Sequence, residues 1–270
     1  MFLKSLSFKI SNMETLILNK IENLLVIKLN RPESLNALTS KMLKELNNVF
    51  SEAQKDNSVR AILLTGEGKG FCSGQDLKDI ENLESFSFYE HLVNNYNPLI
   101  LKMRTIEKPI IVGINGTCAG AGLSLALAGD IRIAKRSAKF TLAFGKIGLI
   151  TDSGSSYFLV RMIGISKTLE LLWTNEIFDS QKALELGIIN KIFEDDEFDN
   201  KIIEFSLDIA NGPTKAYAIS KRFYNRIYEL NLNEVLELEA QYQEVLGKTE
   251  DFKEGVKAFI EKRKPNFKGC

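Results

Sequence analysis

The chain has 270 residues, of which 44% are apolar and 26% charged, a composition typical of a globular protein with a full core. Its 35 basic and 35 acidic residues cancel, which excludes a global electrostatic attraction to nucleic acid or to a membrane surface. Three widely spaced cysteines, Cys72, Cys118 and Cys270, form no metal-type pair and no disulfide framework, so we expect a reduced, cytoplasmic protein without a metal site.

The first two-thirds of the chain alternates short apolar runs with helical patterns. Residues 1–12 form an apolar run broken by lysine and serine, which predicts an N-terminal extension rather than a secretory signal. Within residues 13–195, Thr39 is expected to cap a helix between the first two strands. The runs that predict strands are 24–29, 61–65, 110–114 and 131–134. This order of strands and helices predicts an α/β core.

Residues 110–129 carry no charge over 20 positions, the length needed to span a bilayer. Five of them are glycine, however, and Asn115-Gly116 is a turn signal within the first third. A strand, a tight turn and a buried helix of small residues therefore explain the segment better than a membrane span.

The remainder of the chain, residues 196–270, has helical patterns after an acidic cluster at 194–197. They cover 197–210, 214–229, about 233–246 and 249–263. The stretch "VLELEAQYQEVL" has apolar residues on two faces, which predicts that this region packs on a neighbouring subunit as well as on its own core. The alternative is that it closes the same domain.

The only histidine is His91, in the polar stretch "FSFYEHLVNNYN". Ser-His-Asp and Cys-His catalysis both need a positioned imidazole and would depend on this residue. Its polar surroundings favour a surface residue.

Two glycine-rich turns follow strands, at 63–77 and 114–130. Neither matches a phosphate loop or a dinucleotide fingerprint. Both can offer main-chain N–H groups: Ser73-Gly74 in the first turn, and the residues from Ala121 onward, where a helix begins, in the second. Two donors converging from separate turns would form an oxyanion hole.

Four stretches closely resemble the enoyl-CoA hydratase/isomerase (crotonase) family, in family order and spacing. They are "LNRPESLNALT" (29–39), "GFCSGQDL" (70–77), "KPIIVGINGTCAGAGLSLALAGDIRIA" (108–134) and "LELGIINKIF" (184–193). The ending "EGVKAFIEKRKPNF" (254–267) is also similar. The resemblance covers residues 13–267.

The resemblance implies a spiral of ββα units with a helical C-terminal region that forms trimers or dimers of trimers. It implies an acyl-CoA substrate, whose coenzyme A is part of that substrate, and no further cofactor. The thioester carbonyl would lie between the N–H groups of Ser73 and Ala121. The residues expected to contact the substrate are Glu33, Leu35, Ala37, Ser73, Gly74, Gln75, Asp76, Leu77, Ala121, Thr151, Phe259 and Lys262.

Residues matching the family's catalytic positions favour isomerisation. The two glutamates of a hydratase would align with Ser124 and near Phe144, neither of which can take up a proton. Asp152, in "IGLITDSGSSY", matches instead the aspartate of the phenylacetyl-CoA-pathway epoxide isomerases and of some Δ3-Δ2 enoyl-CoA isomerases. The aryl-CoA dehalogenase branch also has this aspartate, but its histidine would fall at Asn97.

One carboxylate suffices to move a proton from C2 to C4 while an oxyanion hole holds the dienolate. We expect the apolar residues Phe144, Ile147, Leu149 and Ile150 to raise the pKa of Asp152 by desolvation. Three alternatives stay open. Asp152 could cap a helix starting at Ser153, the protein could be a broad-specificity hydratase with Asp152 as its one acid, or it could be a catalytically silent CoA-binding scaffold. The loop 78–98 is expected to help line the acyl pocket.

Overall fold

The structure is a computed structural model and describes residues 13–80, 82 and 84–270. The predicted extension, residues 1–12, lies outside the described residues. Within these ranges, ten strands form two sheets. The six-stranded sheet contains, in spatial order, β1 (Leu16–Ile21), β2 (Leu24–Leu29), β3 (Ala61–Gly66), β5 (Ile110–Ile114), β7 (Ile131–Lys135) and β10 (Lys191–Phe193). The four-stranded sheet contains β4 (Gly70–Cys72), β6 (Thr117–Ala119), β8 (Lys139–Thr141) and β9 (Phe178–Asp179).

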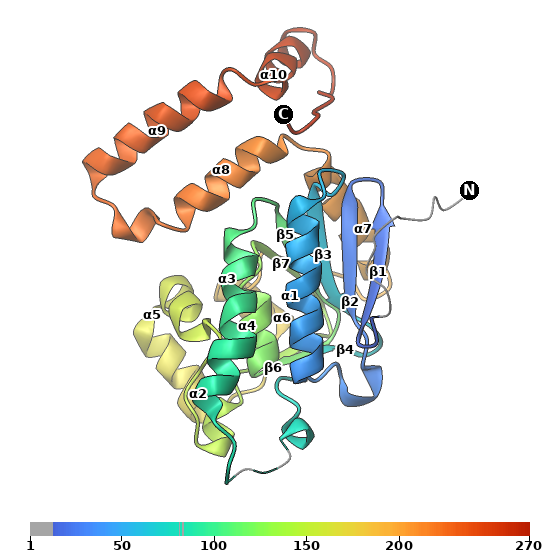
Figure 1. Cartoon of the computed structure of the whole chain (residues 1–270), viewed down its shortest axis with the longest axis vertical. Coiled ribbons are helices and arrows are strands. Elements are labelled where there is room, and N and C mark those ends of the chain that lie inside the picture. The colour runs from blue at the N-terminus through green and yellow to red at the C-terminus, as the bar shows by residue number, and fades with distance from the viewer. Residues whose placement is uncertain (1–12, 81, 83) are drawn as a thin grey trace.

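Helices fill the connections between these strands (Figure 1). They are α1 (Ser40–Lys55), α2 (Phe88–His91), the π-helix η3 (Leu92–Tyr96), α3 (Asn97–Thr105), α4 (Ala121–Leu127), α5 (Ser155–Thr174), α6 (Ser180–Glu185) and α7 (Phe198–Ala210). The C-terminal helices are α8 (Thr214–Tyr224), α9 (Leu232–Leu246) and α10 (Glu250–Ile260). Short 3-10 turns are η1 (Pro32–Ser34), η2 (Leu77–Asp79), η4 (Phe144–Ile147) and η5 (Ile227–Glu229).

The chain passes repeatedly from one sheet to the other. β3, β5 and β7 lie side by side in the large sheet, and the strand that follows each of them, β4, β6 or β8, joins the small sheet. A helix then returns the chain, as α4 does after β6. This is the predicted α/β spiral of ββα units. The four predicted strands are confirmed as β2, β3, β5 and β7, whereas the three-residue strands at the glycine turns are too short to leave an alternating pattern.

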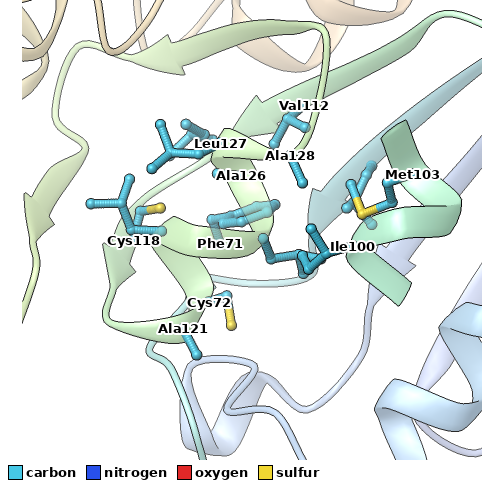
Figure 2. Close-up of a cluster of buried hydrophobic side chains, with 14 of the residues drawn as sticks. Phe71, Cys72, Ile100, Met103, Val112, Cys118, Ala121, Ala126, Leu127 and Ala128 are labelled. Atoms are coloured by element: carbon cyan, nitrogen blue, oxygen red, sulfur yellow. The ribbon is translucent and has the colours of Figure 1, made fainter. Parts of the chain in front are cut away.

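The main core lies between the two sheets and the helices α1, α3 and α4. Figure 2 shows part of it, where side chains of β4 and α4 meet those of α3 and β5. The predicted cap is confirmed, because the Thr39 hydroxyl accepts a hydrogen bond from the Met42 N–H (3.2 Å). On the opposite face of the large sheet, α7 covers a second apolar cluster that includes Phe198 and Ile202.

The uncharged segment 110–129 is divided among β5, β6 and α4, as predicted. No helix of the described part of the chain combines the length and the apolar character that a membrane crossing requires.

The C-terminal helices are confirmed close to their predicted bounds. In Figure 1, α9 and α10 lie apart from the sheets, with α8 between them and the core. α9 has no buried residue, although Leu232 and Leu236 on it are apolar. This lobe therefore leaves apolar surface exposed on a single chain.

Because α4 packs closely on β4, one methyl group added at Gly122 should strongly destabilise the fold. A Cβ at Gly122 would lie 2.4 Å from the Cys72 carbonyl oxygen and 2.7 Å from Cys72 Cβ. We expect Gly122→Ala to lower the free energy of unfolding by about 3 kcal/mol, measured by urea denaturation. Gly255→Ala is the matched control, because its Cβ would make ordinary contact with Phe267 (3.5 Å). Equal stability of the two variants would contradict the expected clash.

Candidate active site

The turn after β4 pairs with the segment before α1, so the first two family-like motifs lie together. Leu38 pairs with Gln75 in a parallel bridge: the Leu38 N–H donates to the Gly74 carbonyl (2.7 Å), and the Asp76 N–H donates to the Leu38 carbonyl (2.9 Å). Arg31 forms an ion pair with Asp76 (2.9 Å). Partial burial alone would raise the pKa of Asp76, but hydrogen bonds from Arg31 and the Lys78 N–H outweigh it and hold the pKa below its usual value.

Ser73 is engaged in holding this pairing. Its N–H donates to the Leu35 carbonyl (3.0 Å), and its hydroxyl donates to the Ser34 carbonyl (2.9 Å). The expectation that Ser73 offers a free N–H is therefore revised. Gln75, two residues later, donates no main-chain hydrogen bond to any described residue. Because Gly74 and Asp76 both bond to Leu38, the N–H of the residue between them points to the opposite side.

The second free N–H belongs to Ala121, as expected. Ala121 begins α4, and its N–H has no hydrogen-bond partner among the described residues. A Cβ placed on Gly74 would lie 3.5 Å from the Ala121 nitrogen, so the two turns approach closely at this point. Gly74 has φ +103° and Gly120 has φ +51°, both in the left-handed region that favours glycine. The turns thus present two unused main-chain donors, those of Gln75 and Ala121, where they approach each other at Gly74.

Asp152 does not cap a helix with its side chain, so that alternative is overturned. α5 begins at Ser155, and its N-cap is Gly154 (φ +83°), without a side-chain cap. The Ser155 N–H donates to the main-chain carbonyl of Asp152 (2.9 Å). Ser153 has φ +49°, a left-handed conformation that is uncommon for a residue with a side chain. Two successive left-handed residues therefore separate Asp152 from the helix that follows it.

The Asp152 carboxylate is half-buried, and its Oδ1 has no hydrogen-bond partner among the described residues. Burial raises the pKa of Asp152 above its ordinary value, as expected. The adjacent Ser153 hydroxyl opposes this rise in pKa, although it is not in hydrogen-bond geometry with the carboxylate. Such a carboxylate is a stronger base than an exposed one and has a free oxygen to accept a proton.

The residues expected to desolvate Asp152 are mostly exposed. Ile147 is 56% exposed, Ile150 is 78% exposed, and Leu149 is also accessible, whereas Phe144 is buried. The hydrophobic pattern around Asp152 is therefore not a core pattern, because η4 and the residues after it run over the surface.

Tyr96 contacts the side chain of Gln75 and was not singled out from the sequence. Its side chain is buried, and its hydroxyl donates to Gln75 Oε1 (2.6 Å). Burial raises the pKa of Tyr96 well above its ordinary value, and the negative charges of Asp152 and Asp79 raise it further. The structure therefore brings Tyr96 to the side chain of Gln75.

His91 is not the plain surface residue that the sequence favours. It is partly buried, with its Nε2 3.1 Å from Gln75 Oε1. Burial lowers the pKa of His91, and the charge of Asp79 opposes that change. The loop 78–98 was expected near the acyl group, and it is the segment that supplies Tyr96 and His91.

The positions that match the hydratase acids lie in the core. Ser124, one turn into α4, is fully buried with its hydroxyl 3.4 Å from the Gly120 carbonyl, and Phe144 is also buried. Thr151, directly before Asp152, is buried and its hydroxyl contacts that of Ser156. Within the described ranges, no group of three His, Cys, Asp or Glu side chains is arranged to hold a metal ion.

Phe259 and Lys262 are not brought to the turn 73–77 of the same chain. Phe259, at the end of α10, is 86% exposed. In Figure 1, α10 lies at one end of the molecule, whereas β4, which the turn 73–77 follows, and α2 lie toward the other.

Two sheets linked by ββα units, two unused main-chain donors on turns that approach each other and a half-buried carboxylate point to an enzyme of the crotonase class. The chain matches the family model described as Enoyl-CoA hydratase/isomerase over residues 19–270. It therefore belongs to the enoyl-CoA hydratase/isomerase family.

Similar proteins carry both hydratase and isomerase names. The chain is 36% identical to the 1,2-epoxyphenylacetyl-CoA isomerase of Escherichia coli, over 87% of this chain and 91% of that protein. It is 38% identical to a protein of Rhodobacter capsulatus described as a probable enoyl-CoA hydratase, over 92% and 95% of the two chains. The crystal structure of an enoyl-CoA hydratase from Bacillus anthracis superposes with a TM-score of 0.88 at 30% identity, covering 95% of this chain and 100% of that one.

Proposed function

We propose that the protein is an acyl-CoA double-bond isomerase in which Asp152 carries the proton. The observation that supports this most is the half-buried Asp152 carboxylate, whose Oδ1 has no partner among the described residues, in a chain where the two positions of the hydratase acids hold Ser124 and Phe144. Hydration by two acids needs a second proton carrier, whereas migration of a double bond needs one.

The reaction balances with one carboxylate. Asp152 removes a proton from C2 of a 3-enoyl thioester, and the electron pair of that C–H bond moves onto the thioester oxygen to form a dienolate. The protonated Asp152 then returns the proton to C4. The double bond between C3 and C4 becomes one between C2 and C3, and the carboxylate is regenerated. The raised pKa of Asp152 reduces the difference in pKa between its carboxyl group and the C2–H group that it deprotonates.

The N–H groups of Gln75 and Ala121 would stabilise the dienolate oxygen. This pair replaces the sequence-based pair of Ser73 and Ala121, since the Ser73 N–H is bonded to Leu35. Loss of one donor of this kind typically raises a barrier by about 3 kcal/mol. Ser73 instead holds the turn 31–37 against the turn 73–77, where Glu33, Leu35 and Ala37 would contact the CoA.

Contacts of Phe259 and Lys262 with the CoA would come from another copy of the chain, because α10 lies away from the turn 73–77 in its own chain. The exposed apolar side chains of α9 and α10, among them Leu232, Leu236 and Ile260, support a homotrimer or a dimer of trimers.

The direct test compares three substrates with the purified protein. We expect conversion of a 3-enoyl-CoA to the conjugated 2-enoyl-CoA, followed by the rise in ultraviolet absorbance of the conjugated thioester, to be faster than hydration of crotonyl-CoA. The name of the E. coli relative favours one further candidate, isomerisation of an epoxide ring on a phenylacetyl-CoA, which would use the same carboxylate. Faster hydration than isomerisation would favour a hydratase, and CoA binding without turnover would favour a scaffold.

A further inference from the structure

We propose that Tyr96 and His91 are positioning residues that clamp the side chain of Gln75 and thereby aim its main-chain N–H at the substrate oxygen. This inference rests on the proposed function, in which that N–H is one of the two oxyanion donors. It adds two side chains that do not themselves touch the reacting atoms.

The amide oxygen of Gln75 receives two hydrogen bonds from the same segment. Tyr96 donates its hydroxyl to Oε1 (2.6 Å), and His91 Nε2 lies 3.1 Å from the same atom. A carbonyl oxygen can only accept, so His91 must carry its proton on Nε2. Asn95 Nδ2 lies 3.2 Å from His91 Nδ1 and can donate to it, which agrees with this neutral tautomer. The Gln75 amide oxygen, the Tyr96 hydroxyl and both ring nitrogens of His91 therefore have matching partners.

The π-helix explains how two residues five positions apart reach one acceptor. On an α-helix, His91 and Tyr96 would lie about 140° apart around the axis. The π-helix Leu92–Tyr96 has hydrogen bonds between residues five apart, as from the Asn97 N–H to the Leu92 carbonyl, and brings them back to one side. Their rings are in edge contact with centroids 5.4 Å apart. π-Turns of this kind occur frequently at functional sites.

The clamp completes a two-sided support of Gln75. On one side the main chain is held by Leu38, through Gly74 and Asp76. On the other side the side chain is held by Tyr96 and His91. The backbone hydrogen bonds fix the position of the turn 73–77 relative to Leu38, while the side-chain hydrogen bonds resist rotation of Gln75 about the strand direction. Rotation of this kind would turn the N–H away from the site.

The test uses acetoacetyl-CoA, whose enolate absorbs in the near ultraviolet, as a probe that needs no turnover. An oxyanion hole that is aligned lowers the apparent pKa of the bound probe and increases the enolate absorbance. We expect Tyr96→Phe to reduce the ratio of bound enolate to bound keto form by about three- to tenfold, the net effect of one hydrogen bond. The kcat for isomerisation should fall by a similar factor with KM almost unchanged, because the lost contact acts in the transition state.

His91 supplies an independent pair of variants. His91→Leu removes the second donor and should lower the enolate signal, whereas His91→Gln retains an amide N–H donor at similar reach and should restore most of it. Tyr89→Phe is the matched control, since Tyr89 lies in the neighbouring helix α2 and is 76% exposed. Thermal unfolding of each variant checks that the fold is intact, and the partly exposed His91 keeps the test available if Tyr96→Phe fails to fold.

The outcomes separate the clamp from the function on which it rests. No enolate signal in the wild-type protein would overturn the proposed oxyanion hole and the clamp together. A wild-type signal that Tyr96→Phe and His91→Leu leave unchanged would overturn the clamp alone. A reduced signal in both variants, partly restored in His91→Gln and unaffected in Tyr89→Phe, is the expected result.

Discussion

Replacing Asp152 with asparagine should abolish most of the isomerase activity while the protein still binds CoA thioesters. We expect kcat to fall by about 10²–10⁴-fold, the usual contribution of a positioned acid-base group. KM should change little, because Asn has the same shape as Asp and most of the expected CoA contacts lie in the turns 31–37 and 73–77. The measurement is the rate of 3-enoyl-CoA conversion in Asp152→Asn and wild-type protein.

The same variant should be more stable than the wild type at neutral pH. Burial raises the pKa of Asp152 from the ordinary value of 3.8. A raised pKa means that the folded state holds its proton more tightly than the unfolded state. The contribution of Asp152 to the free energy of unfolding is therefore fully present below its pKa in the unfolded state. That contribution is lost as the pH rises through its pKa in the folded state. Asparagine does not ionise, so it neither loses this contribution nor leaves an unpaired charge in the folded state. We therefore expect the free energy of unfolding of Asp152→Asn to exceed that of the wild type by about 1–2 kcal/mol near neutral pH.

Asp179→Asn is the matched control for both effects. Asp179 is exposed and caps α6 by accepting a hydrogen bond from the Lys182 N–H (2.9 Å). That hydrogen bond is the main reason why the pKa of Asp179 is lowered, opposite to Asp152. Its variant should retain full activity and show no gain in stability as the pH rises. Full activity of Asp152→Asn would remove Asp152 from the mechanism, and urea denaturation from mildly acidic to neutral pH would show whether its stability gain exists.

Removing the N–H of Ala121 should also have a large effect on catalysis. Ala121 is the first residue of α4, a position where proline fits the helix and where the missing N–H has no helical partner. Ala121→Pro would then delete one oxyanion donor with little change to the helix. We expect kcat to fall by about 10²–10³-fold. The enolate absorbance of bound acetoacetyl-CoA should fall in parallel.

Glu250→Pro places the same residue at the same helical position away from the site. Glu250 begins α10 after the extended Thr249, and its side chain forms only an exposed pair with Lys253 (2.7 Å). This control should retain wild-type kcat. If Ala121→Pro also retained it, with the fold intact by circular dichroism, the N–H of Ala121 would not be an oxyanion donor.

The sequence alone determined the architecture and singled out the carboxylate that we propose as the proton carrier. Continuous apolar runs predicted β2, β3, β5 and β7, because strands buried on both faces need such runs. The motifs at 29–39, 70–77 and 108–134 indicated the family, and the absence of acids at Ser124 and Phe144 left Asp152 as the matched carboxylate. These features are read locally, from residue type and spacing, and need no knowledge of distant contacts.

Only the tertiary structure decided which groups are free to act. The Ser73 N–H is used by Leu35, and the Asp152 side chain does not reach the start of α5. Tyr96 and His91 reach Gln75 because a π-helix turns them to one side. A hydrogen bond depends on partners that the fold brings together from far along the chain, so neither its presence nor its absence can be read from local pattern. The spacing of residues therefore located the site, and the fold selected its donors.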